Sequence, residues 1–203
     1  EVITAVNTFV ATAGAIETAG AKIVFVDCNE KYVMDPSLVE AAITPKTKAI
    51  MPVHFSGQPV DMPRIMEIAN KHNLHVIEDT CQGVGAKING KFCGTYGIMS
   101  GYSVHPLKNL NVWGDGGLVA TDSEELTEKL RLMRNHGIIN RDEYAFYAYN
   151  SRLDTLQAVI GNHLIKDIKW ITDSKIRNAK KFDDAFSGLK DVITVPDRPG
   201  NEK

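Results

Sequence analysis

Short apolar runs alternate with stretches of helical periodicity in the first part of the chain, and this alternation constrains the fold more than any other feature. The apolar runs at 23–26, 49–53 and 75–77 each end at a polar residue, which is typical of buried parallel strands. Helical patterns fill the intervals, at 36–43 and 61–72. Strands and helices in this order predict an open α/β sheet with right-handed crossovers.

The rest of the chain predicts short strands followed by helices. The pair Asn89-Gly90 is a strong hairpin-turn signal. Thr121 and Glu124 have the spacing of a capping box, which predicts the start of a helix. The expected elements are a turn at 88–91, strands at about 99–103 and 117–121, a helix from 121 to about 137, and helices at 150–171 and 174–186.

Composition excludes several classes of protein. The chain has 203 residues, 43% of them hydrophobic, which is enough for one globular domain with a sizeable core. A formal charge of −2 with scattered positive residues argues against nucleic acid as a partner. No stretch approaches the ~18 uninterrupted apolar residues of a membrane span, and no signal-peptide layout is present, so we expect a cytoplasmic protein without membrane contact.

Neither a metal site nor a nucleotide loop is predicted. Cys28, Cys81 and Cys93 show no CxxC spacing and are interpreted as packing residues. The glycine-rich run at 114–117 lacks the spacing of dinucleotide-binding and P-loop motifs. The chain begins at Glu1 without an initiator Met and ends in a loop-like run at 196–203, so we expect it to be part of a longer protein.

Three residues at predicted strand ends are candidate site residues. Asp79 ends the strand at 75–79, where doubly wound sheets bind ligands, but a capping role fits its position equally well. Lys108 follows a predicted strand and could be a desolvated amine that forms Schiff bases, although most lysines are solvated surface charges. His54 could line the same crevice as Asp79 or be a hydrogen-bonded structural residue.

Seven short motifs, taken together, resemble those of the DegT/StrS-like sugar aminotransferases, which are fold-type I enzymes that use pyridoxal 5′-phosphate (PLP). Their order along the chain is that of the family, which makes the resemblance specific. The resemblance implies a three-layer α/β/α fold with a mostly parallel sheet. The motifs are TFVAT (8–12), VHFSGQP (53–59), IEDTCQ (77–82), SVHPLKNL (103–110), GDGG (114–117), RNHG (134–137) and YNSRLD (149–154).

The resemblance also implies catalytic and cofactor-binding roles for individual residues. Lys108 would hold PLP covalently and then move a proton as a base. Asp79 would keep the pyridine nitrogen of PLP protonated. Gln82 would hydrogen-bond the phenolic oxygen, Phe9 would stack on the ring and Ser103 would bind the phosphate.

Asn150 matches a residue that reaches the phosphate of the neighbouring subunit, so the resemblance implies a homodimer with shared active sites. It further implies that residues 1–160 form the PLP-binding large domain and that 161–203 form a helical connection toward a small domain that is largely missing. The implied function is transfer of an amino group from glutamate or glutamine to a keto sugar, nucleotide-linked in most relatives, for amino-sugar or surface-polysaccharide biosynthesis.

Two alternative functions remain open. The chain could be a non-catalytic fragment that binds PLP or dimerises, because relatives carry an additional N-terminal phosphate cradle and a C-terminal small domain. It could also be a sugar dehydratase that depends on pyridoxamine phosphate (PMP). In that branch of the family histidine replaces the lysine, so Lys108 argues against it.

Overall fold

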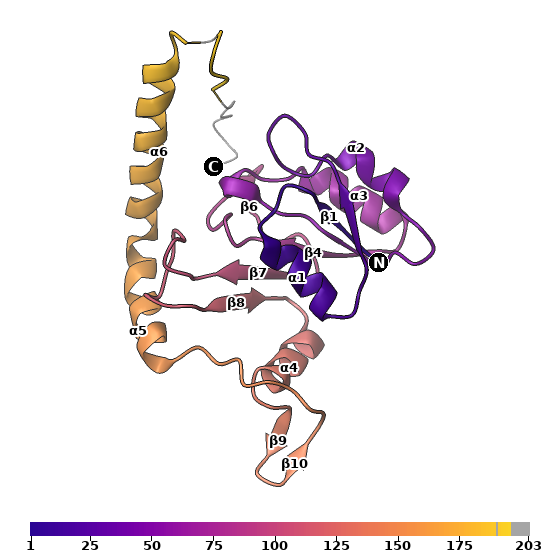
Figure 1. Ribbon diagram of the computed structural model, residues 1–203. Helices are drawn as coiled ribbons and strands as arrows, with labels where there is room; N and C mark the ends of the chain where they lie inside the picture. Colours follow the sequence, from indigo (N-terminus) through magenta and orange to yellow (C-terminus); the bar gives the residue numbers. More distant parts are fainter. Residues whose placement is uncertain (190, 196–203) are drawn as a thin grey trace.

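A six-stranded sheet forms the centre of the protein (Figure 1). The computed structural model describes residues 1–189 and 191–195. Five strands run parallel and β8, at one edge, runs antiparallel to β7, so the predicted mostly parallel α/β sheet is confirmed. In sheet order, the strands are β2 (Ile23–Val26), β1 (Val2–Ala5), β3 (Ala49–Met51), β4 (His75–Asp79), β7 (Met99–Ser103) and β8 (Gly117–Ala120).

Helices cover both faces of this sheet. The chain passes from β1 to β2 in one direction through α1 (Val10–Thr18) and then returns past β1 to β3 through α2 (Pro36–Val39) and η1 (Glu40–Ala42). The next crossover, from β3 to β4, carries α3 (Met62–Lys71) and continues in the second direction. Crossovers of the same hand in opposite directions place their helices on opposite faces, which makes the three layers.

The main core lies between the sheet and α3. Ile3 and Ile50 of the strands pack in one buried cluster with Ile65 and Ile68 of α3, all at most 1% exposed. Ile16 of α1 is also buried, but outside this cluster, as expected for the opposite face. Alternation along β4 directs Val76 and Glu78 into the main core and leaves His75, Ile77 and Asp79 for the α1 face.

Side-chain caps mark where α2, α3 and α4 begin. The Asp61 side chain accepts a hydrogen bond from the backbone N–H of Arg64, which caps the N-terminus of α3 and confirms the helix predicted at 61–72. The capping box predicted at Thr121 is wrong, because α4 (Glu124–Met133) is capped by Ser123. The Thr121 hydroxyl instead donates to the carbonyl of Ile98 and accepts from the Ser123 N–H.

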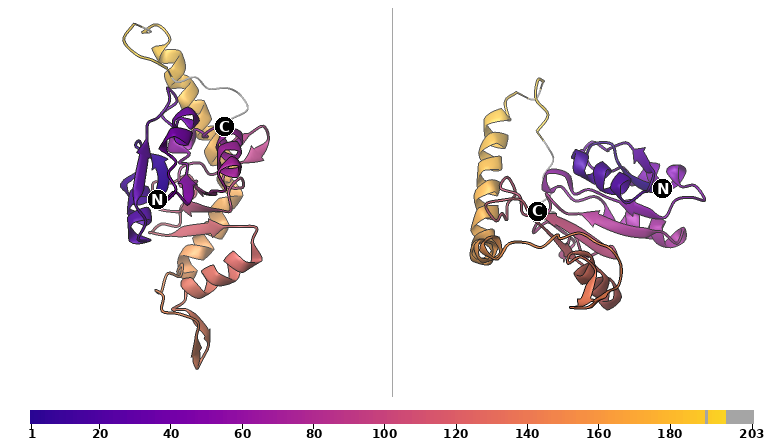
Figure 2. Two further views of the ribbon diagram at one scale, coloured as in Figure 1. Left: turned by 90° about the vertical axis from the view of Figure 1, so that its right-hand side faces the viewer. Right: turned by 60° about the horizontal axis from the view of Figure 1, so that its bottom comes forward.

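The C-terminal helices differ from their predicted ranges. Residues 150–154 are extended, and the helices are α5 (Thr155–Leu164) and α6 (Ile168–Phe186), joined by η3 (Ile165–Asp167). Leu164 and Ile168 pack against a small second core formed by Val104, Leu110 and Val112. Figures 1 and 2 show α6 as a long helix that stands beside the sheet and extends past it.

Two hairpins complete the described fold. The predicted turn at 88–91 joins β5 (Lys87–Ile88) to β6 (Lys91–Phe92). A second hairpin, which the sequence did not predict, pairs β9 (Ile138–Asn140) with β10 (Glu143–Tyr144). The loop-like run at 196–203 lies outside the described residues. No helix among the described residues is long and apolar enough to cross a membrane.

We predict that Gly137→Ala destabilises the protein more than Gly20→Ala. Both glycines have a positive φ, 73° and 74°, which costs an alanine about 1–2 kcal/mol. A Cβ at Gly137 would also lie 1.9 Å from the carbonyl oxygen of Phe146, whereas nothing lies within 4 Å of one at Gly20. Chemical unfolding should therefore show the larger loss for Gly137→Ala, and equal losses would contradict this explanation.

Candidate active site

The candidate site lies where β4 and β7 end, on the face of the sheet that α1 covers. Asp79 pairs in register with Gly101 of β7, and Ser103 follows two residues later, so both side chains belong to the same face. These ends belong to the carboxyl edge of the parallel strands, where open α/β sheets bind ligands. The register therefore brings together two residues that lie 24 positions apart in sequence.

The Asp79 carboxylate is held by two donors. The Thr12 hydroxyl of α1 donates to Oδ2 at 2.7 Å, and the backbone N–H of Cys81 donates to Oδ1 at 3.1 Å. The Asp79 backbone is also fixed. Its N–H donates to the carbonyl of Pro52, and its carbonyl accepts from the backbone N–H of His54. Asp79 is half-buried and keeps further acceptor capacity on both oxygens.

The Cys81 thiol follows Asp79 by two residues and lies 3.8 Å from the carbonyl oxygen of Gly101. Burial and the negative charge of Asp79 raise the pKa of Cys81, the positive charge of Lys108 lowers it, and the resulting pKa is about 12. Lys108 follows β7, the strand whose Gly101 pairs with Asp79, so the two residues come from the carboxyl ends of neighbouring parallel strands. A thiol with so high a pKa stays protonated at neutral pH and is a poor nucleophile beside the amine.

The side chain of Gln82 has a defined orientation. Its Oε1 accepts a hydrogen bond of 2.8 Å from the backbone N–H of Ser56, in the short 3-10 turn η2 (Phe55–Gly57). Only the oxygen can accept, so the amide N–H₂ group points the other way, as a donor. Gln82 is half-buried, and Gly57 approaches its backbone closely enough that a Cβ there would lie 3.3 Å from the Gln82 carbonyl oxygen.

Phe9 and Asn150 lie at exposed positions. Phe9 is 64% exposed at the N-cap of α1, one turn before Thr12. The backbone of Asn150 pairs with that of Asn135 in an isolated antiparallel β-bridge. The Asn150 Oδ1 accepts a hydrogen bond from the Nε of Arg152 at 2.9 Å. The contacts of Asn150 are therefore with Asn135 and Arg152.

His54 is a buried structural residue rather than a lining residue of the site. Its Nδ1 accepts from the Val60 N–H at 3.3 Å, so the proton on Nε2 is directed at Glu78 Oε2, 3.1 Å away. Glu78 also accepts from the backbone N–H groups of Gly94, Tyr96 and Gly97, at 2.6–2.8 Å. Burial would raise the pKa of Glu78, but these hydrogen bonds outweigh it, and the pKa is lowered.

A model of the DegT/DnrJ/EryC1/StrS aminotransferase family matches residues 1–203. The chain belongs to this family. A UDP-N-acetyl-3-dehydro-α-D-glucosamine 3-aminotransferase from Acidithiobacillus ferrooxidans is 45% identical over 200 residues, which are 98% of this chain and 54% of that protein.

Solved structures of the family share the fold. DesV from S. venezuelae, in complex with a ketimine intermediate, matches with a TM-score of 0.92 at 35% identity and covers 100% of this chain and 54% of its own. NtdA from Bacillus subtilis, with bound cofactor PMP, matches with a TM-score of 0.89 at 34% identity over 99% of this chain and 47% of its own. The chain spans about half the length of these family members.

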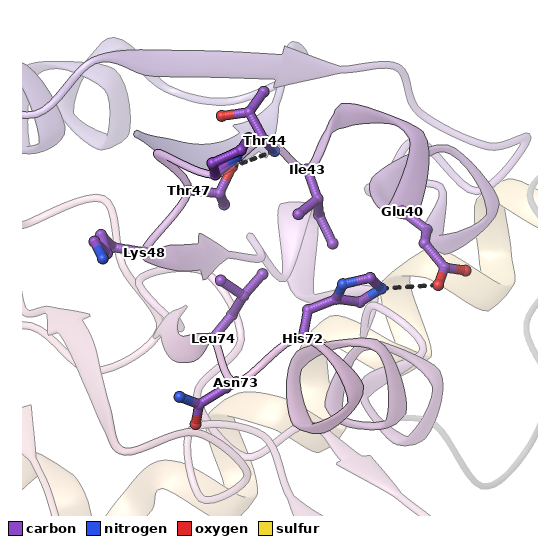
Figure 3. A pocket seen from close by; sticks show the side chains of 9 residues that line it. Glu40, Ile43, Thr44, Thr47, Lys48, His72, Asn73 and Leu74 are labelled. Atoms are coloured by element: carbon purple, nitrogen blue, oxygen red, sulfur yellow. Dashed lines mark hydrogen bonds and ion pairs between the residues drawn. The ribbon is translucent and has the colours of Figure 1, made fainter.

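A surface hollow at the other end of the sheet does not belong to the site (Figure 3). Lys48 and Leu74, which precede β3 and β4, line it, whereas Asp79 ends β4. At its rim Glu40 accepts from His72 Nε2 at 2.9 Å and pairs with Lys71, and these partners lower the pKa of Glu40 to about 2. Within the described residues, no group of His, Cys, Asp and Glu could hold a metal ion.

The sequence analysis missed two residues of the site. Thr12 is 4% exposed and touches Asp79, yet only its place in the TFVAT motif distinguished it from other threonines. Cys81 was interpreted as a packing residue, although it lies two positions after Asp79. The i, i+2 spacing at a strand end was the available signal, because a backbone N–H two residues after an Asp commonly donates to its carboxylate.

We predict that Glu78→Gln lowers the free energy of unfolding by about 2 kcal/mol at pH 7, because an amide presents N–H groups to donors that need acceptors. The pKa of Glu78 is lowered in the folded protein, so the stabilisation is present above the ordinary pKa of a glutamate and is lost as pH falls through the folded pKa. Urea unfolding at pH 7 and pH 4 should show the wild type approaching the variant in acid. Glu17→Gln, at an exposed position, is the control and should change little.

Proposed function

We propose that this chain is the cofactor-binding part of a PLP-dependent aminotransferase that transfers an amino group from glutamate or glutamine to a nucleotide-linked keto sugar. The observation that carries the proposal is the Asp79 carboxylate, which Thr12 and the Cys81 N–H hold at the carboxyl edge of the sheet, while Lys108 follows the neighbouring strand β7. Family membership supports the reaction class. The relative that acts on a UDP-linked dehydro sugar supports the substrate class.

The residues at this edge fit PLP. A pyridine ring needs a carboxylate at its nitrogen, a donor at its phenolic oxygen and an amine near its carbonyl carbon. Asp79, Gln82 and Lys108 offer these three groups, and the Gln82 amide already presents its N–H₂ side. The PMP bound to NtdA supports the same cofactor chemistry here.

PLP, when bound, supplies an electron sink for the negative charge that develops when the donor loses its Cα proton. With the cofactor bound, Lys108 would be the base that accepts this proton and the acid that returns it. Asp79 holds a proton on the ring nitrogen by remaining a carboxylate, and Thr12 and the Cys81 N–H hold the plane of that carboxylate.

Three further residues would position the cofactor. Gln82 donates to the phenolic oxygen, and the Ser103 hydroxyl, on the same face as Asp79, binds the phosphate. Phe9 covers one face of the ring, and its exposure leaves its aromatic surface available for stacking.

We further propose a homodimer with shared sites, in which Asn150 serves the phosphate of the neighbouring subunit. The exposure of Asn150, and its engagement with Arg152 outside the site of its own chain, support this role. Within each subunit, residues 1–160 would form the PLP-binding domain and 161–203 a helical connection, which is consistent with the position of α6 beside the sheet (Figure 1).

The two alternatives predict different products. A PMP-dependent dehydratase would yield a deoxygenated sugar, and Lys108 argues against it because that branch carries histidine there. A non-catalytic PLP-binding fragment would bind cofactor without turnover. Formation of 2-oxoglutarate from glutamate in equal amount with an aminated sugar, measured in the full-length protein, would exclude the dehydratase.

We predict that Lys108→Ala abolishes the visible absorption band that appears when PLP is added to the wild-type protein, because the band requires a covalent bond to this amine. Borohydride should fix PLP to Lys108 in the wild type, as peptide mass analysis would show. Lys129→Ala, an exposed lysine of α4, is the matched control and should retain the band. An unchanged band in Lys108→Ala would refute the proposed role.

A further inference from the structure

We propose that Thr8 and Thr12 form a hydroxyl relay that orients the Asp79 carboxylate toward the ring nitrogen, so that both are positioning residues for the cofactor. The Thr8 and Thr12 hydroxyl oxygens are 2.7 Å apart, and the Thr12 hydroxyl lies 2.7 Å from Asp79 Oδ2. The inference rests on the proposed function and adds two residues to it. Both belong to the TFVAT motif, in which only Phe9 has so far received a role.

The direction of the relay follows from counting protons. An ionised carboxylate can only accept, so the single Thr12 hydroxyl proton points to Asp79. Thr12 then has no proton left for Thr8, and Thr8 must donate to Thr12. Each hydroxyl polarises the next, which strengthens the final bond to the charged group.

The relay fixes the carboxylate from the helix side. Thr12 is 4% exposed, and its β-branched side chain has few rotamers within the first turn of α1. The Cys81 N–H holds the other oxygen from the loop after β4. The carboxylate plane is therefore set by two elements that are independent in sequence, while each oxygen keeps a lone pair for a further donor.

Buried hydroxyl groups also stabilise folds through their hydrogen bonds. If Thr12 had only such a structural role, its loss would lower the stability of the protein without a specific effect on cofactor binding. Thr4 of β1 provides the comparison. It is fully buried, and its hydroxyl donates to the Met51 carbonyl at 2.8 Å without touching Asp79. Thr4→Val and Thr12→Val each remove one buried hydroxyl and keep the side-chain volume.

The test measures the dissociation constant of PLP by absorbance titration, beside the unfolding midpoint without cofactor. Thr12→Val should weaken PLP binding about tenfold, because hydrogen bonds to charged groups are the strong ones. Thr8→Val should weaken it less, about twofold, since it acts through Thr12. Thr12→Ser keeps the hydroxyl and should bind as the wild type does, and Thr4→Val should alter the midpoint alone.

A cofactor analogue separates positioning from stability. In 1-deazapyridoxal 5′-phosphate a carbon replaces the ring nitrogen, so the wild type and Thr12→Val should bind this analogue equally. Equal binding of PLP itself by the two proteins would overturn the relay and leave the proposed function intact. An equal loss for PLP and the analogue would also overturn it, and failure of the wild type to bind PLP would refute the proposed function itself.

Discussion

The alternation of side chains along β4 is the constraint on which the site depends. Glu78 points into the main core, where His54 and three backbone N–H groups satisfy its carboxylate, and Asp79 points to the opposite face. A slip of one residue in register would exchange the two carboxylates and leave each without its partners. The buried pair of His54 and Glu78 therefore fixes Asp79 on the face of the sheet that α1 covers.

The strands and crossovers could be predicted from the sequence because buried parallel strands are continuous apolar runs with polar ends. The first strand and helix could not, since α1 contains Gly14 and little periodic contrast between its faces. The start of α4 was misplaced by two residues because Thr121 and Ser123 both carry capping hydroxyls, and only tertiary contact with Ile98 decides between them. Tertiary contacts also fix the break between α5 and α6, through the packing of Leu164 and Ile168.

The candidate site was predictable to the extent that motifs mark it. Asp79 and Lys108 stood out at or after strand ends, but the pairing of their strands, β4 and β7, depends on a register that no local pattern specifies. Thr12 contacts Asp79 across 67 positions of sequence, so its role needs the three-dimensional structure. The direction of the Gln82 amide depends in the same way on Ser56, which comes from another crossover.

The sheet ends at β8, an edge strand whose four residues are all exposed and include Leu118 and Val119. Its outward backbone groups offer a template for strand addition, and neither proline nor a charged side chain interrupts the row. Concentrated solutions of this chain alone should accordingly favour edge-to-edge self-association. A lysine in place of Val119 would be a simple remedy for crystallographers and for anyone storing the protein.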